Sequence, residues 1–327
     1  MDGKPSFSAS LVGLCRDALK VSFDLFKIMV PVLILVKVLQ ELDLIKFLAM
    51  PLGPVMELVG LPGEMGLVWA TAMLNNLYSA MVVLISLVKH TPITAAQATV
   101  LCTMMLVAHT LPIELRIAQK SGARLIFQTI SRLSSAFLLG WLLHNAYSFF
   151  GLLQQPANIL FKPKTETTPY HESLSSWATG EAKNLFYIFL IILGLFLLMR
   201  ILKKLQIIEF MNHILQPLLK LFGIGPKASA ISVIGLTMGL SYGGGLIIHE
   251  ARSGRIDKKD VFYSLTLMGL CHSLIEDTLL MVAIGGHLSG LLWARLLFSL
   301  TALAFLVKLT NSLTDTFRDK YLWGKPK

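Results

Sequence analysis

Two short runs of polar residues interrupt apolar stretches of this sequence and match each other in residue type. The first is His109-Thr110-Leu111-Pro112-Ile113-Glu114 and the second is His272-Ser273-Leu274-Ile275-Glu276-Asp277. Ionisable groups inside apolar helices are costly to bury and therefore indicate function. Imidazole and carboxylate groups together could relay a proton, bind a divalent metal ion or bind a polar solute.

The two runs belong to a repeat that extends over much of the chain. A shift of 163 positions without a gap aligns the histidines, and it also aligns Glu114 with Asp277 and Arg132 with Arg295. The same register pairs Pro54 with Pro217, Gly60 with Gly223 and Gly122 with Gly285. Such a match over about a hundred residues indicates a duplication, and internal symmetry in an apolar chain is typical of transporters.

The composition predicts an integral membrane protein. Of the 327 residues 54% are hydrophobic and 15% are charged, against roughly 45–50% apolar residues in soluble domains. The mean hydropathy is +0.68. Several runs reach the ~20 residues that cross a bilayer as a helix: 20–40, 66–88, 95–118, 124–148, 184–202, 227–249, 261–284 and 288–310.

The charge pattern predicts how the chain is threaded. The net charge of +10 lies in short loops and the C-terminal tail, which favours orientation in the membrane over a nucleic-acid partner. Loops 250–259 and 116–124 are rich in Lys and Arg, whereas their equivalents 87–96 and 279–287 are not. Because basic loops stay cytoplasmic, the two halves face opposite ways and both termini are cytoplasmic.

These observations predict an all-α integral membrane protein made of two inverted-topology repeats. The predicted divisions are a first repeat at 1–153, a polar extracytoplasmic linker at 154–182, a second repeat at 183–311 and a basic cytoplasmic tail at 312–327. The three widely spaced cysteines indicate neither a disulfide framework nor a zinc site.

Each repeat also contains a stretch that must leave and return on one face of the membrane. Amphipathic segments 44–59 and 207–222 are expected to lie along the interface. The apolar runs that follow are predicted to be re-entrant hairpins, bent at Asn75-Asn76-Leu77-Tyr78 and at Ser241-Tyr242-Gly243-Gly244-Gly245. The alternative is that the runs span the membrane as ordinary helices and that glycine allows them to pack closely.

The polar residues are expected to meet at the interface of the repeats. Pro112 should break or kink its helix beside His109, whereas His272 and Glu276 are four apart and should share one helix face. Arg132 and Arg295 are predicted to pair with Glu114 and Asp277, or else to contact an anionic substrate. His109 and His272 are expected to face a central cavity.

The pattern resembles the Gate, or nucleoside-recognition, family over roughly 42–148 and 205–311. That family includes spore maturation proteins A and B, concentrative nucleoside transporters and the membrane part of the ferrous-iron transporter B. The resemblance rests on an amphipathic helix ending in Gly or Pro, a broken apolar run and a following helix with polar groups. It implies transport, no resident cofactor and the bacterial cytoplasmic (inner) membrane.

Two functions follow from these residues. The first is an ion-coupled secondary transporter of a small polar or anionic solute, nucleoside-like solutes included, by alternating access around a central His/Glu/Asp site, with H⁺ or Na⁺ as the coupling ion. Its predicted binding residues are Asn75, Asn76, Tyr78, His109, Glu114, Ser241, Tyr242, Gly243, Gly244, His272, Glu276 and Asp277. The alternative is a divalent metal permease with ligands His109, His272, Glu114, Glu276 and Asp277.

An enzyme is not expected, because the sequence offers no nucleophile with a base and an orienting group at a recognisable spacing. The expected partners are the lipid bilayer and a small molecule or ion. A homo-oligomer is compatible with the sequence.

Overall fold

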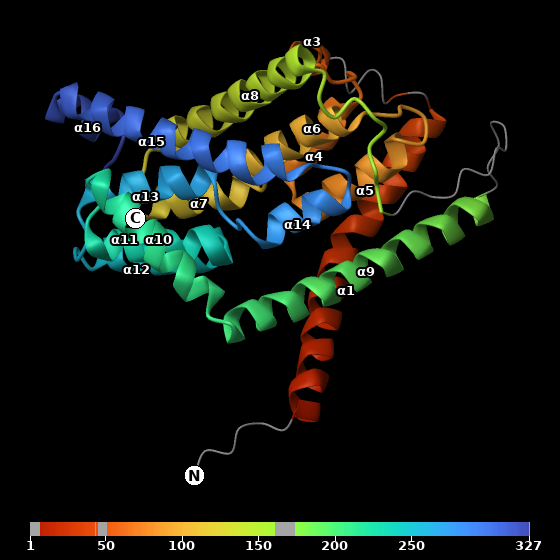
Figure 1. The fold of residues 1–327 in the computed structure, drawn as a ribbon, viewed down its shortest axis with the longest axis horizontal. Coiled ribbons are helices and arrows are strands. Elements are labelled where there is room, and N and C mark those ends of the chain that lie inside the picture. The colour runs from red at the N-terminus through yellow and green to blue at the C-terminus, as the bar shows by residue number, and fades with distance from the viewer. Residues whose placement is uncertain (1–6, 43, 45–50, 161–173, 327) are drawn as a thin grey trace.

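The computed structural model describes residues 7–42, 44, 51–160 and 174–326, and within these ranges the regular secondary structure is helical (Figure 1). The first half contains α1 (Phe7–Glu41), α3 (Gly53–Leu58), α4 (Met65–Leu74), α5 (Leu77–Leu87), α6 (Ala95–Val107), α7 (Leu111–Lys120) and α8 (Leu125–Phe150). The second contains α9 (Leu174–Lys204), α10 (Ile207–Leu221), α11 (Pro226–Met238), α12 (Leu240–Arg252), α13 (Lys258–Leu270), α14 (Glu276–Ala283), the π-helix η1 (Ser289–Ala294), α15 (Arg295–Ser312) and α16 (Asp315–Tyr321).

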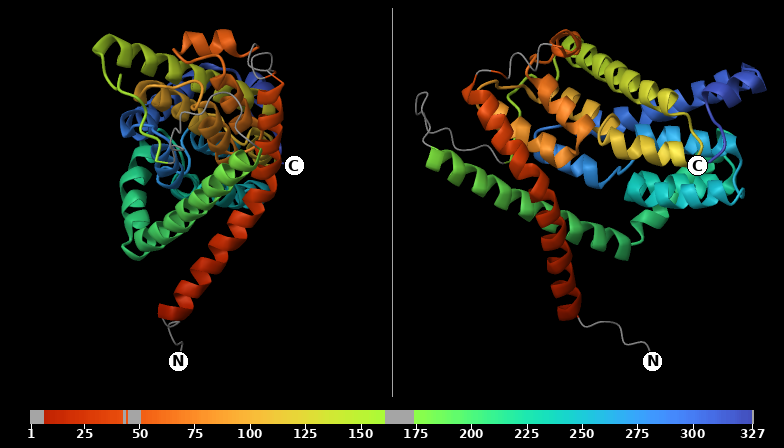
Figure 2. Two further views of the ribbon diagram at one scale, coloured as in Figure 1. Left: turned by 90° about the vertical axis from the view of Figure 1, so that its right-hand side faces the viewer. Right: turned by 180° about the vertical axis from the view of Figure 1, so that it is seen from behind.

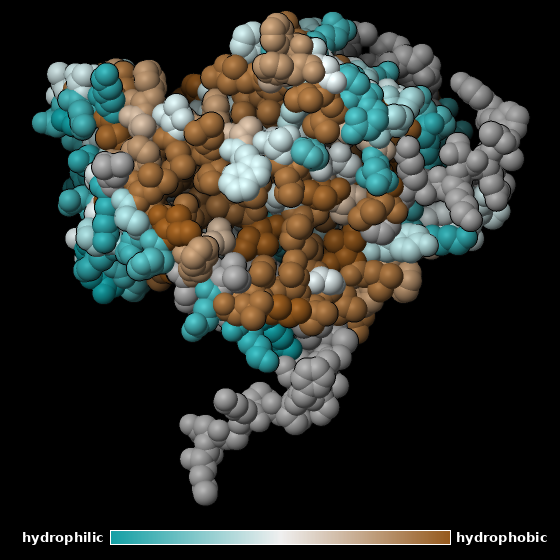
Figure 3. All heavy atoms as spheres, in the orientation of Figure 1, coloured by the Kyte–Doolittle hydropathy of each residue, from teal (hydrophilic) through white to brown (hydrophobic). Residues whose placement is uncertain are grey.

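The helices have the length and surface of a membrane protein. Four of the described segments are long and apolar enough to cross a bilayer: Ala95–Lys120, Leu125–Phe150, Ser175–Leu202 and Ser289–Ser312. Figure 3 shows apolar side chains over the middle of the molecule and polar side chains gathered toward its left and right ends. The chain is therefore an all-α membrane protein, as its composition predicts.

Unusual backbone conformations recur at equivalent places in the two halves. Positive φ angles occur at Gly60 and Gly223, at Thr110 and Ser273, and at Gly122 and Gly285. Each pair has the spacing of the sequence repeat. The duplicated sequence therefore gives the same turns and the same helix break in both halves.

The last long helix of each half runs in the opposite direction to its counterpart. At the start of α8, the Arg124 amide donates to the Leu322 carbonyl, 2.9 Å away, beyond the C-terminal end of α15. Near the end of α8, the Tyr147 hydroxyl is 2.8 Å from that of Ser289, where η1 begins. Figures 1 and 2 show α8 and the η1–α15 helix running in these opposite senses, which is the arrangement that inverted repeats require.

Each half also contains a helical hairpin. In the first half α4 packs against α5, and the chain turns at Asn75 and Asn76, where the sequence places the bend. In the second half α11 packs against α12, but the helix breaks at Gly239, with φ +91°, and not within Ser241 to Gly245.

The position of this second bend has a steric explanation. Glycine weakens a helix without ending it, whereas the backbone of Gly239 is in a region that side chains disfavour. The glycine triplet instead continues α12. A Cβ at Gly244 would lie 2.6 Å from Ile117 Cγ2, so this glycine allows α12 to approach α7.

Two further segments contain structure that the sequence analysis did not specify. Helix α9 begins at Leu174, so part of the predicted linker 154–182 is helical, while 161–173 lies outside the described residues. The C-terminal tail forms α16 and then packs on the protein, with the Trp323 ring 5.2 Å from that of Phe262. The apolar pair Leu322-Trp323 explains this docking, because both side chains are buried. Residues 45–50 of the predicted interfacial segment 44–59 also lie outside the described residues.

The contact between the two halves at Gly290 gives a stability prediction. A Cβ there would lie 2.5 Å from Thr99 Cγ2. Thr99 cannot rotate away, because its hydroxyl donates to Ala95 O and accepts from His287 N. We expect Gly290→Ala to lower the free energy of unfolding by about 1–3 kcal/mol, measured by thermal unfolding in detergent.

The matched control is Gly194→Ala in α9, where nothing lies within 4 Å of the added Cβ. That change should be neutral or stabilising by up to about 1 kcal/mol, since alanine favours helix. Equal effects of the two substitutions would contradict the close approach of η1 to α6.

Candidate functional site

The two matching polar runs form breaks between paired helices. Helix α6 ends at Val107 and α7 begins at Leu111, with Thr110 left-handed at φ +49° and Pro112 in the first turn of α7. The prediction that Pro112 marks a break beside His109 is thus confirmed. Since proline lacks an amide hydrogen, it is tolerated at this position in a helix.

The second half breaks at the same place without a proline. Helix α13 ends at Leu270 and α14 begins at Glu276, with Ser273 left-handed at φ +47°. The prediction that His272 and Glu276 share one helix face is therefore wrong. The Leu274 amide donates to Leu236 O, 2.8 Å away, instead of continuing the hydrogen-bond ladder of α13.

The hairpins satisfy backbone groups that these breaks leave free. Thr110 N donates to Ala72 O at 2.9 Å, near the end of α4, just as Leu274 N donates to Leu236 O near the end of α11. Non-helical backbone at membrane depth needs such partners within the protein. The tips of both hairpins therefore contact the chain segments that carry His109 and His272.

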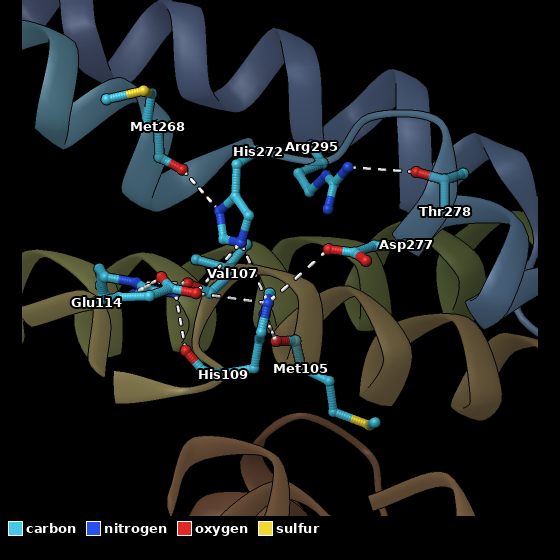
Figure 4. A network of polar contacts seen from close by, with 10 residues as sticks. Met105, Val107, His109, Glu114, Met268, His272, Asp277, Thr278 and Arg295 are labelled. Atoms are coloured by element: carbon cyan, nitrogen blue, oxygen red, sulfur yellow. Dashed lines mark hydrogen bonds and ion pairs between the residues drawn. The ribbon is translucent and has the colours of Figure 1, made fainter. Parts of the chain in front are cut away.

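These segments bring the two histidines into contact (Figure 4). Their Nε2 atoms are 3.1 Å apart and their ring centroids 4.8 Å apart. The opposite ring nitrogen of each is held by a carbonyl one turn earlier: His109 Nδ1 lies 3.0 Å from Met105 O and His272 Nδ1 lies 2.8 Å from Met268 O. A carbonyl only accepts, so each Nδ1 carries the proton, and the Nε2 of a neutral ring presents a lone pair.

Two carboxylates complete the cluster. Glu114 Oε1 lies 3.3 Å from His272 Nε2 and 3.6 Å from His109 Nε2, and Asp277 Oδ2 lies 3.8 Å from His109 Nε2. The side chains of His109, His272 and Glu114 are at most 8% exposed, whereas that of Asp277 is 17% exposed. We call these four residues the central cluster.

Arg132 joins the central cluster to the end of α6. Its guanidinium forms an ion pair with Glu114 Oε2, and it donates to Val107 O at 3.0 Å and to His109 O at 3.2 Å. The carbonyls at a helix C-terminus lack partners within the helix. Arg132 therefore supplies them while it neutralises Glu114, and the predicted Glu114–Arg132 pair is present.

Arg295, the counterpart of Arg132, has different contacts. It is fully buried, and its Nη2 donates to Thr278 Oγ1 at 3.2 Å, while Nε and Nη1 have no hydrogen-bond partner in the part of the chain that the structure describes. The predicted pair with Asp277 is absent among the described residues. Aspartate is one methylene shorter than the equivalent Glu114, and Asp277 is turned toward His109 in Figure 4.

Those remaining predicted site residues whose side chains the structure describes are not members of the central cluster. Asn76 caps α5 by accepting from Ser79 N at 2.8 Å, and Asn75 donates to Ser79 Oγ at 3.0 Å. Tyr78 is half-buried near the carboxylates of Glu276 and Asp277. Gly244 packs on Ile117, and the side-chain environments of Ser241, Tyr242 and Gly243 lie outside the described residues.

The sequence interpretation missed Thr278. Its hydroxyl is the hydrogen-bond partner of Arg295, and a polar residue next to Asp277 in an apolar stretch was the available signal. It also missed the carbonyls of Met105 and Met268, which lie four residues before the histidines and carry no side-chain signal.

The class of protein defined by this fold is a membrane protein in which two similar halves meet at buried polar helix breaks. The family model for nucleoside recognition, named Gate, matches the chain twice, at 22–122 and at 185–288. The chain belongs to this family, which is associated with transport of nucleosides and other solutes across membranes. It is also 25% identical over 314 residues to the "Uncharacterized membrane protein YvoD" of Bacillus subtilis (strain 168), covering 94% of this chain and 95% of that protein. No solved structure matches the chain.

Proposed function

We propose that this protein is a secondary transporter that carries a small polar solute, of the nucleoside-like kind, by alternating access around the central cluster. Transport is coupled to a cation that binds in the same cluster. The atoms that the four residues direct at one another are the Nε2 atoms, Glu114 Oε1 and Asp277 Oδ2, all of which can accept hydrogen bonds. They suit cations and solutes that offer N–H or O–H groups better than a bare anion.

The difference between the two arginines carries this proposal. Arg132 and Arg295 occupy equivalent positions in inverted halves, yet only Arg132 has an anionic partner and two carbonyl partners. A buried charge without partners is unfavourable. The structure then represents one of two states. In this state the arginine of the first half is paired with a carboxylate and the arginine of the second half is not.

In the opposite state the halves exchange these roles. Arg295 would pair with Asp277 and donate to the carbonyls of Leu270 and His272, while Arg132 leaves Glu114. Asp277, Leu270 and His272 are the repeat equivalents of Glu114, Val107 and His109. Rocking of one inverted half against the other around a fixed site is the usual form of alternating access, and this exchange supplies two discrete arrangements with similar contacts.

The proposal is tested by thermal unfolding of the purified protein with a panel of nucleosides, other polar metabolites, organic anions and cations. A ligand at 100 times its Kd raises the free energy of unfolding by about 2.7 kcal/mol. We expect at least one nucleoside-like solute to do so, and the effect to disappear in the His109→Ala, His272→Ala double variant.

The control is His90→Ala, which removes an exposed histidine at the end of the first hairpin. It should keep the full stabilisation. Stabilisation that persists in the double variant would place the solute elsewhere in the protein and contradict the proposal.

A further inference from the structure

We infer that the cation bound by the central cluster is a divalent transition-metal ion, held by His109, His272 and Glu114 in tetrahedral geometry. The inference rests on the proposed function, since it names the ion that this site takes during transport. It differs from the expectation of H⁺ or Na⁺ in the sequence analysis.

Three electron-pair donors point at one another in the central cluster. Both imidazoles place their proton on Nδ1, so both Nε2 atoms present lone pairs across 3.1 Å. Glu114 Oε1 adds an acceptor 3.3 and 3.6 Å from these nitrogens. Three acceptors in a buried site repel one another unless a cation lies between them. A single proton can bridge two of the atoms, but a metal ion satisfies all three.

The three donor atoms also have the spacing of ligands around one metal ion. Zinc binds histidine nitrogen and carboxylate oxygen at about 2.0–2.1 Å, so two ligands of a tetrahedral site are about 3.3 Å apart. The observed separations of 3.1, 3.3 and 3.6 Å lie on either side of this value. One ion can therefore contact all three atoms without movement of the backbone.

Each of the three side chains is also held in place through its other polar atom. Histidine ligands of metals usually donate their other N–H to a carbonyl or carboxylate, which fixes the ring and raises its basicity. Both histidines do so here, to Met105 O and Met268 O. The second oxygen of Glu114 is bound by Arg132, which leaves Oε1 directed at the histidines.

The ligand types select the class of ion. Two nitrogens and one carboxylate oxygen suit Zn²⁺, Co²⁺ or Fe²⁺, whereas Mg²⁺ and Ca²⁺ prefer sites made of oxygen. Zinc sites with three protein ligands keep a fourth position open. Asp277, the most exposed member of the cluster, lies 3.8 Å from His109 Nε2 and can fill or vacate that position, as an ion that must enter and leave requires.

The test is titration of the purified, metal-stripped protein with Co²⁺, whose visible absorption distinguishes tetrahedral from octahedral coordination, followed by competition with Zn²⁺. We expect one ion per chain, a tetrahedral spectrum and displacement by Zn²⁺. His109→Ala and His272→Ala should each weaken binding by more than about 100-fold, because loss of a group that only orients a ligand already costs 10- to 100-fold.

Glu114→Gln keeps the shape of the side chain and should weaken Co²⁺ binding, and His90→Ala should leave binding unchanged. Because Glu114→Gln leaves the buried Arg132 without its carboxylate, thermal unfolding first checks that this variant is folded. An octahedral spectrum, or Co²⁺ binding that survives in the double histidine variant, would overturn the inference. So would the absence of binding in a folded native protein, which would indicate that only a proton occupies the cluster.

The metal inference and the transport proposal fail in different ways. If Co²⁺ does not bind but a polar solute still stabilises the protein through His109 and His272, only the metal inference is wrong. If Co²⁺ binds as described while no solute of the panel stabilises the protein, the metal site is supported and the proposed solute class is wrong.

Discussion

Replacing Arg132 by methionine is expected to lower the free energy of unfolding by about 3–5 kcal/mol, because it leaves a buried partner charge unpaired. Glu114 would lose its cation, and Val107 O and His109 O would lose their donor at the end of α6. Methionine has a similar length to the aliphatic part of arginine, so the effect should come from charge and hydrogen bonding rather than from a cavity.

The equivalent substitution in the other half is the matched control. Arg295→Met removes a buried guanidinium that has one hydrogen bond, to Thr278, and two nitrogens without partners. Replacement of a poorly paired buried charge by an apolar side chain is often neutral or stabilising. Thermal unfolding of both variants in detergent measures the difference. Equal destabilisation by the two substitutions would show that the arginines are in equivalent states, contrary to the structure.

The second large effect is on transport and comes from the same Arg295→Met substitution. In the proposed opposite state Asp277 is paired with Arg295, so the variant leaves that carboxylate unpaired there. A cost of about 3–5 kcal/mol reduces the population of that state by about 150- to 5,000-fold. Uptake into proteoliposomes of the solute found by stabilisation should fall accordingly, although the protein remains as stable as the native one.

A double variant separates charge exchange from simple damage to the site. Asp277→Asn combined with Arg295→Met removes the carboxylate that the single variant leaves unpaired in the opposite state, so uptake should recover at least in part. Loss of uptake that is the same in the single and double variants would contradict the exchange of ion pairs between the two halves.

Much of the fold was predictable because the duplication makes each half a check on the other. The register that aligns His109 with His272 placed both residues at the interface of the halves, where their rings are in contact. Pro112 predicted the helix break in the first half, whereas the break in the second half was not predicted. The Glu114–Arg132 pair was predictable from equal distances along two antiparallel helices. Composition and run length were sufficient for an all-α membrane protein.

The differences arise where the two halves are not equivalent in structure. A glycine triplet can bend a helix or allow it to pack closely on a neighbour, as α12 packs on Ile117. The sequence alone does not distinguish the two roles, because both depend on the absence of a side chain. Likewise, the alignment of Asp277 with Glu114 hides the methylene that Asp277 lacks. One sequence must encode both of the proposed states, so it cannot indicate which arginine is paired in either of them.

The central claim is that two inverted halves meet at His109 and His272, and it is tested most directly by labelling equivalent loops from the two sides of the membrane. Lys120 and His287 are exposed and lie at matching connections of the two halves, whereas Lys258 is exposed at the start of α13. Each is replaced by cysteine and treated in sealed vesicles with a membrane-impermeant maleimide, with the native chain as background. We expect Lys120→Cys and Lys258→Cys to react from one face and His287→Cys from the other. Reaction of Lys120→Cys and His287→Cys from the same face would contradict the account.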